Sequence, residues 1–315
     1  MENQVLYDWV SLTSKIDEPQ TLIAMLGLDR EGVSWEQIKG QHGYRDRLYW
    51  ERINIHYNGR EDMGVWLEMT GQGCRAFESF GSGDYEALLA YAAENPDDVH
   101  LTRLDVAFDD HTGVLDLDMV ARDTLHREYI SKAHIAQIEH KIDDRLEHWA
   151  GLSVYHGSRA SNVMLRIYDK AAERGFLDRH WVRVELQLRD ERAFAFVMRN
   201  ESIGESFVGV LRNYLRYIDE PEAGADCNRS RWPMKPYWSR LLGTVAPVQL
   251  YTKPGTEYNM LNLENFVFRQ AGGAIWTYLE THTIEQFLAE LKEQRPANLN
   301  PKYKAIIEQA KGGSA

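Results

Sequence analysis

The sequence predicts an α+β fold, in which a mainly antiparallel sheet carries helices on one face and polar side chains on the other, followed by a mostly helical C-terminal part. Three observations support this prediction. Segments that alternate apolar and polar side chains recur between residues 6 and 189, and such alternation indicates strands with one buried face. Helical patterns separate pairs of these strands, which favours α+β over repeated βαβ units. An apolar fraction of 43% in 315 residues is enough for a sizeable core.

Turn-forming residues set the limits of the expected elements. The helix at 84–94 ends at Asn95-Pro96, because proline disfavours helical backbone in the residue before it. The segment GSRASN is rich in turn formers and joins two strands in a hairpin. We expect strands at 6–12, 44–50, 52–57, 64–70, 101–108, 151–156, 163–169 and 181–189, and helices at 84–94, near 115–129, over 190–218 and at 284–294.

The chain is expected to divide near a linker at 221–236, giving a domain at 1–220 and a mostly helical region at 221–315 with a role in DNA recognition or dimerisation. No apolar run approaches the roughly 18 residues of a membrane span, and the N-terminus lacks the pattern of a signal peptide. Two cysteines, Cys74 and Cys227, show no metal-type spacing. These features predict a cytoplasmic protein without a membrane partner.

The net charge of −12 restricts how the chain could bind nucleic acid. Proteins that bind nucleic acid non-specifically are usually basic, because neutralising phosphates supplies much of their affinity. Any contact with DNA must therefore rest on local basic patches or on a bound cation.

Four of the expected strands place carboxylates and a tyrosine on the polar face. Alternation puts Glu68, Asp105, Tyr168 and Glu185 opposite the apolar side chains of their strands. A solvated sheet face with cross-strand ion pairs is the ordinary alternative. However, mid-strand positions disfavour such residues, Asp above all, and three carboxylates on one face repel one another unless a cation joins them. The pattern therefore predicts a site for Mg²⁺ or Mn²⁺, which favour oxygen ligands.

A tyrosine beside such a metal has a chemical use. Tyr168 lies between Arg166 and Lys170 on the same strand face. A metal-polarised phosphodiester, with both cations stabilising the developing charge, can be attacked by the phenol oxygen. The product would be a 5′-phosphotyrosyl link and a free 3′-OH.

These residues resemble a known family. The segments TRLDVAFDD, YHGSRASNVMLRIYDKAAE and WVRVELQLR, in this order, are similar to the replication initiation factor family. That family contains initiators of rolling-circle plasmids, related phage proteins and relaxases of conjugative elements. LEMTGQGCRAFE and YDWVSLT look like its N-terminal strands, and the resemblance covers roughly residues 6–192.

The resemblance implies roles for individual residues. It makes Tyr168 the nicking nucleophile, with Arg166 and Lys170 in the flanking basic positions. The implied metal ligands are Asp105, Asp109 and Glu185, with Glu68 as the equivalent on the earlier strand.

Nearby residues offer weaker candidates. Tyr155 is a rival nucleophile, but it corresponds to an unreactive family position and is expected to pack across the hairpin. His156 and His180 could supplement the metal site, although a lone histidine is more often a surface residue.

DNA contacts are expected in two segments and at Arg183. The loop GSRAS could contact phosphate, and basic residues interleaved with aromatics at 228–240 suit stacking on single-stranded or hairpin DNA. A linker whose aromatics anchor it to the core is an equal alternative for 228–240. The candidates are Ser158, Arg159, Ser161, Arg183, Arg229, Arg231 and Lys235.

The leading hypothesis is a metal-dependent tyrosine nickase that acts on origin DNA, with a host helicase as partner and a homodimer as a way to supply a second strand transfer. Two alternatives stay open at this point. One is a hydrolytic metal nuclease in which water attacks, and the other is a non-enzymatic DNA-binding regulator of the same fold.

Overall fold

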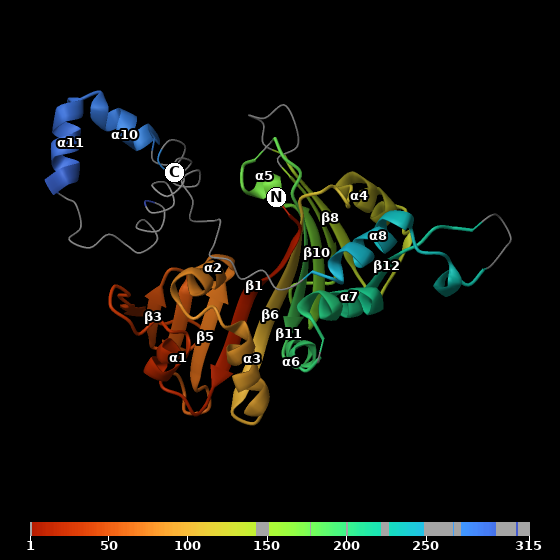
Figure 1. Cartoon of the computed structure of the whole chain (residues 1–315), viewed down its shortest axis with the longest axis horizontal. Coiled ribbons are helices and arrows are strands. Elements are labelled where there is room, and N and C mark those ends of the chain that lie inside the picture. Colours follow the sequence, from red (N-terminus) through yellow and green to blue (C-terminus); the bar gives the residue numbers. More distant parts are fainter. Residues whose placement is uncertain are drawn as a thin grey trace.

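The computed structural model describes residues 2–142, 151–176, 178–199, 201–221, 227–248 and 272–293, together with positions 267 and 307. Its centre is a ten-stranded sheet in the order β2-β3-β4-β5-β1-β6-β11-β10-β9-β8, in which every neighbouring pair is antiparallel (Figure 1). The predicted α+β class with an antiparallel sheet is thus confirmed. The strands are β1 (Gln4–Ser14), β2 (Glu36–Lys39), β3 (Asp46–Trp50), β4 (Ile53–Tyr57), β5 (Val65–Thr70), β6 (Val99–Asp110), β8 (Ala136–Lys141), β9 (Gly151–His156), β10 (Val163–Asp169) and β11 (Val182–Arg189).

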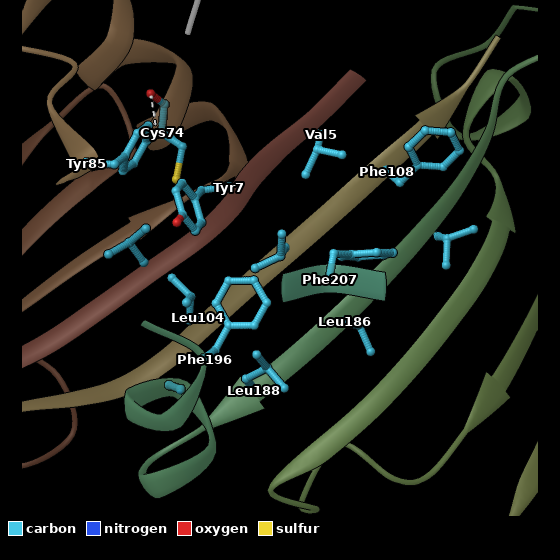
Figure 2. Close-up of a cluster of buried hydrophobic side chains, with 14 of the residues drawn as sticks. Val5, Tyr7, Cys74, Tyr85, Leu104, Phe108, Leu186, Leu188, Phe196 and Phe207 are labelled. Carbon is cyan, nitrogen blue, oxygen red and sulfur yellow. Dashed lines mark hydrogen bonds between the residues drawn. The ribbon is translucent and has the colours of Figure 1, made fainter. Parts of the chain in front are cut away.

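One face of this sheet carries the helices. Apolar side chains of the central strands, such as Leu104, Phe108 and Leu186, form one core with the buried faces of the helices (Figure 2). Phe196 and Phe207 contribute from the helix layer. The helices are α1 (Pro19–Met25), α2 (Gly71–Phe80), α3 (Tyr85–Glu94), α4 (Leu117–Leu125), α5 (Lys170–Glu173), α6 (Glu191–Val197), α7 (Ile203–Tyr214), α8 (Pro236–Val245), α10 (Gly272–Leu279) and α11 (Ile284–Glu293).

The opposite face of the sheet is polar, as alternation predicts. Register brings residues of the polar sets together across strands: Arg166 pairs with Glu185, and Gln187 with Asp105. Partners in an antiparallel register point to the same face. The polar face is therefore continuous across β10, β11, β6, β1, β5 and β4.

A β-bulge in β1 shifts the alternation of that strand. Pairing with β6 slips between Tyr7 and Trp9, so that Asp8 is the extra residue. Arg75 of α2 donates a hydrogen bond of 2.8 Å to the carbonyl oxygen of Tyr7 at this point, and its own charge is balanced by Glu78. Bulges redirect side chains in this way, often next to functional sites.

Several elements differ from the prediction. The helix expected over 190–218 is broken into α6, α7 and a short strand, β12 (Leu215–Tyr217), which pairs with β7 (Tyr129–Ser131). The strand expected at 64–70 is present as β5, whereas the rest of LEMTGQGCRAFE, which the resemblance likened to a strand, belongs to α2. The strand β8 was not predicted, because only Ala136 and Ile138 of its mostly exposed AQIEHK are apolar, which is too short an alternation to indicate a strand.

The core continues beyond the expected linker. A single 3₁₀ turn at Arg229–Arg231 leads into α8, which packs on α7 and buries Trp238 and Leu241 in the common core. The expected boundary at 220/221 therefore does not coincide with an end of the core. Farther along, α10 and α11 contact each other. No helix in the described ranges is long and apolar enough to cross a membrane.

Candidate active site

Tyr168 lies near the end of β10 with its side chain on the polar face but covered by neighbours. Only 2% of it is exposed, and its hydroxyl donates a hydrogen bond of 3.1 Å to Oε2 of Glu185 on the adjacent strand. Burial, and then the negative charge of Glu185, raise the pKa of Tyr168 well above its usual value. The phenol is therefore protonated at rest and already bonded to a proton acceptor.

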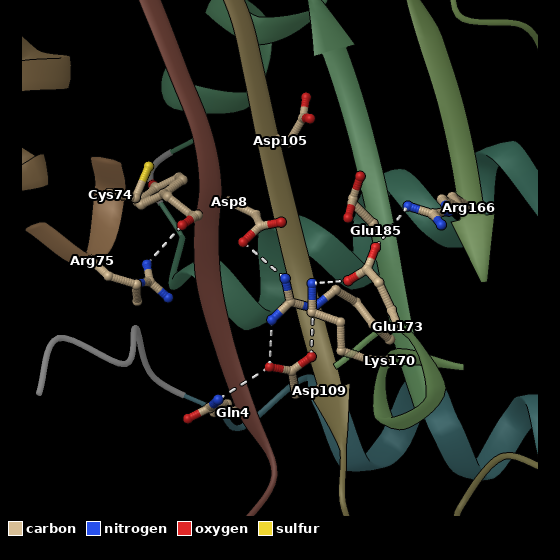
Figure 3. Close-up of polar contacts among 12 residues, drawn as sticks. Gln4, Asp8, Cys74, Arg75, Asp105, Asp109, Arg166, Lys170, Glu173 and Glu185 are labelled. Carbon is tan, nitrogen blue, oxygen red and sulfur yellow. Dashed lines mark hydrogen bonds and ion pairs between the residues drawn. The ribbon is translucent and has the colours of Figure 1, made fainter. Parts of the chain in front are cut away.

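Two cations cover the ring of Tyr168. The guanidinium carbon of Arg166 lies 3.6 Å from the ring centroid and the Lys170 amine lies 5.5 Å from it. Both are held by Glu173 of α5, which is 3.7 Å from Arg166 and forms a close ion pair with Lys170 (Figure 3). Burial, and then the charge of Arg183, lower the pKa of Lys170. The structure thus brings the three residues predicted as catalytic into one group.

Three carboxylates lie beside this group on the same face of β1, β6 and β11, namely Asp8, Asp105 and Glu185, here called the carboxylate cluster (Figure 3). The Asp105 carboxylate points away from the group, and Arg103 donates to both of its oxygens. Burial, and then the charges of Asp8 and Asp105, raise the pKa of Glu185 to about 7. Burial also raises the pKa of Asp105 to about 6, with Asp8 adding to the effect against the bonds from Arg103. The mutual repulsion predicted from the sequence is therefore present, but one of its sources is a residue that the sequence analysis did not select.

Asp8 was not predicted as a member of the site, because the β-bulge changes the direction of its side chain. Strict alternation groups it with Leu6 and Val10 on an apolar face, whereas the bulge turns it toward Glu185. The available signal was an aspartate in the middle of the strand YDWVSLT, the same signal that selected Asp105. Gly71 makes room for it, since a Cβ there would lie 2.8 Å from its Oδ1.

Asp109 and Arg183 form a buried ion pair instead of separate metal and DNA contacts. Arg183 Nε and Nη2 donate to the two Asp109 oxygens at 2.6 and 2.7 Å, and Nη1 lies 2.8 Å from Asp8. Burial alone would raise the pKa of Asp109, but the charge and hydrogen bonds of Arg183 hold it below its usual value. Arg183 was expected to contact DNA, but only 2% of it is exposed, so DNA cannot reach it in this structure. Asp109, which was expected to bind the metal, is instead the counterion of Arg183.

Glu68 is the clearest departure from the predicted site. Its strand, β5, is separated from β11 by β1 and β6, so the two strands lie roughly 14 Å apart across the sheet. Glu68 is also in register with Arg189 rather than with Glu185. Glu68 accepts a hydrogen bond of 3.3 Å from Asn54 on β4. The right face was predicted, but strand order places this residue outside the cluster.

A divalent cation fits the chemistry of the carboxylate cluster. The donors are all carboxylate oxygens, the kind that Mg²⁺ and Mn²⁺ prefer, and a cation would relieve the repulsion that raises the pKa of Asp105 and Glu185. As the side chains stand, no three acidic, histidine or cysteine residues of the described ranges are gathered closely enough to hold a metal ion. Binding would thus require the carboxylates to turn toward one another.

The neighbouring candidates have other contacts. Tyr155 is buried and lies opposite Arg166 across the hairpin, as expected for a packing residue. His156 is fully buried and hydrogen-bonded to the Tyr217 hydroxyl at 3.0 Å, and burial lowers its pKa to about 4. His180 lies 3.2 Å from Asp110. None of the three reaches the cluster through a contact in the described part of the chain.

The expected DNA-contact residues fall into two places. Ser158 and Arg159 are exposed in the β9–β10 loop, where Ser158 and Ser161 hydroxyls bond at 2.9 Å. This loop lies about five residues along β10 from Tyr168, or roughly 16 Å.

The second group does not form a free basic patch. Lys235 is buried among Asp123, Glu128 and Asp219, and its ion pair with Asp123 is 3.0 Å long. Arg229 donates to the backbone at Arg127 and Tyr129, while Arg231, in the same turn, also has a partner. The anchoring alternative is therefore supported for this segment.

Comparisons with known proteins identify the family of this chain. The profile described as replication initiation factor matches residues 99–292, and that of the rolling circle replication initiation protein N-terminal domain matches residues 4–87. The putative DNA relaxase NicK of Bacillus subtilis (strain 168) is 25% identical over 268 residues, which cover 80% of this chain and 74% of the relative. The structure of a rolling circle replication initiator protein from Geobacillus stearothermophilus has a TM-score of 0.72 and 29% identity, and the match covers 80% of this chain and 100% of that chain. The resemblance drawn from the motifs is confirmed, and the chain belongs to the replication initiation factor family.

Proposed function

We propose that the chain nicks one strand of origin DNA by attack of Tyr168, which leaves the protein joined to the 5′ end and a free 3′-OH. The observation that carries the proposal is the hydrogen bond from Tyr168 Oη to Glu185, at the edge of the carboxylate cluster and beneath two cations. The names of the relatives, a rolling circle initiator and a putative DNA relaxase, support the same chemistry.

The reaction is a transesterification. As the Tyr168 oxygen bonds to phosphorus, the bond from phosphorus to the 3′ oxygen breaks and the phenol proton passes to Glu185. Glu185 Oε2 already accepts the hydrogen bond of the phenol, so it is in place to take this proton. The departing 3′ oxygen takes a proton from Lys170 or from water, and the phosphodiester energy is kept in the phosphotyrosyl bond.

Arg166 and Lys170 would stabilise the charge of the pentacovalent phosphorus. Both are held by Glu173 at rest, and Arg166 lies over the ring that must react. A DNA phosphate can replace Glu173 as their anionic partner, so that substrate binding would uncover Tyr168.

A bound Mg²⁺ or Mn²⁺ would polarise the scissile phosphate. In this proposal Asp8, Asp105 and Glu185 hold the ion. Asp109 supports them indirectly, because its ion pair fixes Arg183 beside Asp8.

The test is formation of a covalent adduct. Labelled single-stranded oligonucleotides that tile the DNA element carrying the gene are incubated with protein and Mn²⁺ and run on a denaturing gel. Wild type and Tyr155→Phe should give a protease-sensitive adduct, while Tyr168→Phe should give none. An adduct with Tyr168→Phe would show that another residue reacts, and cleavage by wild type without any adduct would favour the hydrolytic nuclease.

A further inference from the structure

The polar face continues away from Tyr168 as a surface of aromatic and arginine side chains. It is made by Trp9 on β1, Arg103 on β6, Trp66 on β5, His56 on β4 and Arg47 on β3, and it is called here the aromatic–arginine surface. Register places Trp9 opposite Asp105 of the carboxylate cluster. The surface therefore begins on the strands β1 and β6 of the site and extends over three further strands, β5, β4 and β3.

The aromatic side chains present stacked rings. His56 and Trp66 are direct cross-strand partners whose rings are 4.5 Å apart and inclined by 19°. Tyr44 stacks beyond them at 6.1 Å from Trp66. Closer to the site, the Arg103 guanidinium lies 3.9 Å from the ring centroid of Trp9. Both tryptophans are only half-buried, so ring and guanidinium surface is open to a further planar group.

Some nitrogen atoms of this face lack partners. Arg103 lies directly opposite Arg189, and the like charges are balanced in part by Asp105, to which Arg103 Nε donates at 2.9 Å. The Nε atoms of Arg47 and Arg189 and Nδ1 of His56 are buried without a hydrogen-bond partner in the described part of the chain. Guanidinium groups that keep an unpaired donor suit phosphate oxygens.

The surface is also hollowed. A depression of about 620 Å³ is lined by Arg47, Tyr49, Arg52 and Asn54 and also by the carboxylates of Glu36 and Glu68. Glu68, which is remote from the carboxylate cluster, belongs to this hollow. A carboxylate can accept hydrogen bonds from base amino groups, which gives it a use here.

We propose that the aromatic–arginine surface binds the single strand of DNA that adjoins the scissile phosphate, with bases stacked at Trp9 and Trp66 and phosphates near Arg103, Arg189 and Arg47. Stacking requires unpaired bases, since a duplex hides the faces of its bases, so the occupant is single-stranded DNA. The assignment of this strand as the substrate rests on the proposed function, whereas the binding itself does not.

The few arginines set the expected salt dependence. With about three phosphate contacts, log K should fall with log salt concentration with a slope near −2. Affinity carried by stacking in this way is compatible with a chain of net charge −12.

The experiment measures binding without cleavage. Fluorescein-labelled oligothymidine of about 20 nucleotides is titrated with the Tyr168→Phe protein in EDTA, and anisotropy is recorded. Adding Trp66→Ala should weaken binding about 5- to 100-fold. Arg47→Gln should also weaken oligothymidine binding and should make log K depend less steeply on log salt concentration. If Trp66→Ala does not fold, the Arg47→Gln variant alone still tests the proposal. The matched control is Trp276→Ala, which removes a tryptophan that is 66% exposed on α10.

The outcomes separate this proposal from that of the nucleophile. If folded Trp66→Ala and Arg47→Gln proteins bind oligothymidine as tightly as their parent, or if duplex DNA competes as well as single strands, the surface is not the binding site. If the Trp66→Ala and Arg47→Gln variants both lose binding while Tyr168→Phe still forms the adduct, the aromatic–arginine surface is the DNA-binding site but Tyr168 is not the nucleophile.

Discussion

Replacing Arg183 by methionine tests whether this arginine is structural, as its burial indicates, or a DNA contact, as the sequence suggested. The side chain is 2% exposed, and it neutralises Asp109, which is not exposed at all. Methionine keeps much of the volume but removes the charge and both bonds to Asp109, of 2.6 and 2.7 Å. Removing one partner of a buried ion pair typically costs about 3–5 kcal/mol.

The assay is urea denaturation followed by far-UV circular dichroism at pH 7. Arg183→Met should lower the free energy of unfolding by about 3–5 kcal/mol, whereas Arg189→Met, on the same strand but half-buried, should lower it by less than about 1 kcal/mol. The double variant Arg183→Met/Asp109→Leu should recover part of the loss, because Asp109 is then no longer an unpaired buried charge, whereas Asp8 still lacks its contact with Arg183.

The effect should depend on pH with a defined sign. Arg183 holds the pKa of Asp109 below its usual value, so the pair stabilises the fold above the unfolded-state pKa and loses this contribution as pH falls through the folded-state value. In Arg183→Met, burial acts unopposed and Asp109 takes up a proton more readily. The deficit should therefore be largest at neutral pH and shrink toward about pH 4. A deficit below about 1 kcal/mol at pH 7, together with weaker DNA binding, would refute the structural role.

Three further predictions concern the site. Glu173→Gln should release Arg166 and Lys170, so that the adduct forms at lower DNA concentration than in wild type. If the variant needs the same or a higher DNA concentration, the ion pairs with Glu173 do not compete with DNA binding. The pKa values of Asp105 and Glu185 are raised to about 6 and about 7, so their ionised forms destabilise the fold, and the metal-free protein should become more stable by on the order of 2 kcal/mol from pH 8 to pH 5. Differential scanning fluorimetry should show that Mn²⁺ raises the melting temperature at pH 8 but not at pH 5. Equal effects at the two pH values would contradict the carboxylate cluster as the Mn²⁺ site. Gly71→Ala should displace Asp8 and weaken Mn²⁺ binding measured by calorimetry, with little change in fold, whereas unaltered affinity would exclude Asp8 from the metal site.

The parts of the site that follow strict alternation were predictable. Arg166, Tyr168 and Glu185 lie on regular stretches of β10 and β11, and register brings them together on the predicted face. The position of Asp8 could not be predicted from strict alternation along the strand, because the residue inserted at the bulge puts all later side chains of the strand on the opposite face. Glu68 was placed on the correct face, but strand order decides how far apart two residues of one face lie, and order is a property of the whole sheet.

Charged residues were predicted least well where their partners are distant in sequence. Arg183 and Lys235 look like basic DNA contacts in isolation, yet Asp109 and Asp123 neutralise them within the fold. Seventy-four positions separate Arg183 from Asp109, and no local pattern links the two. The family resemblance fixed the order of the motifs but did not reveal these pairings.

The most direct test of the central claim is to locate the residue that carries DNA after nicking. The adduct formed with Mn²⁺ is digested with nuclease and protease, and the peptide that retains a nucleotide is sequenced by tandem mass spectrometry. The account predicts a nucleotide on Tyr168, within the peptide that begins after Arg166 and ends at Lys170. A nucleotide on Tyr155, or cleaved DNA with no modified peptide, would contradict it.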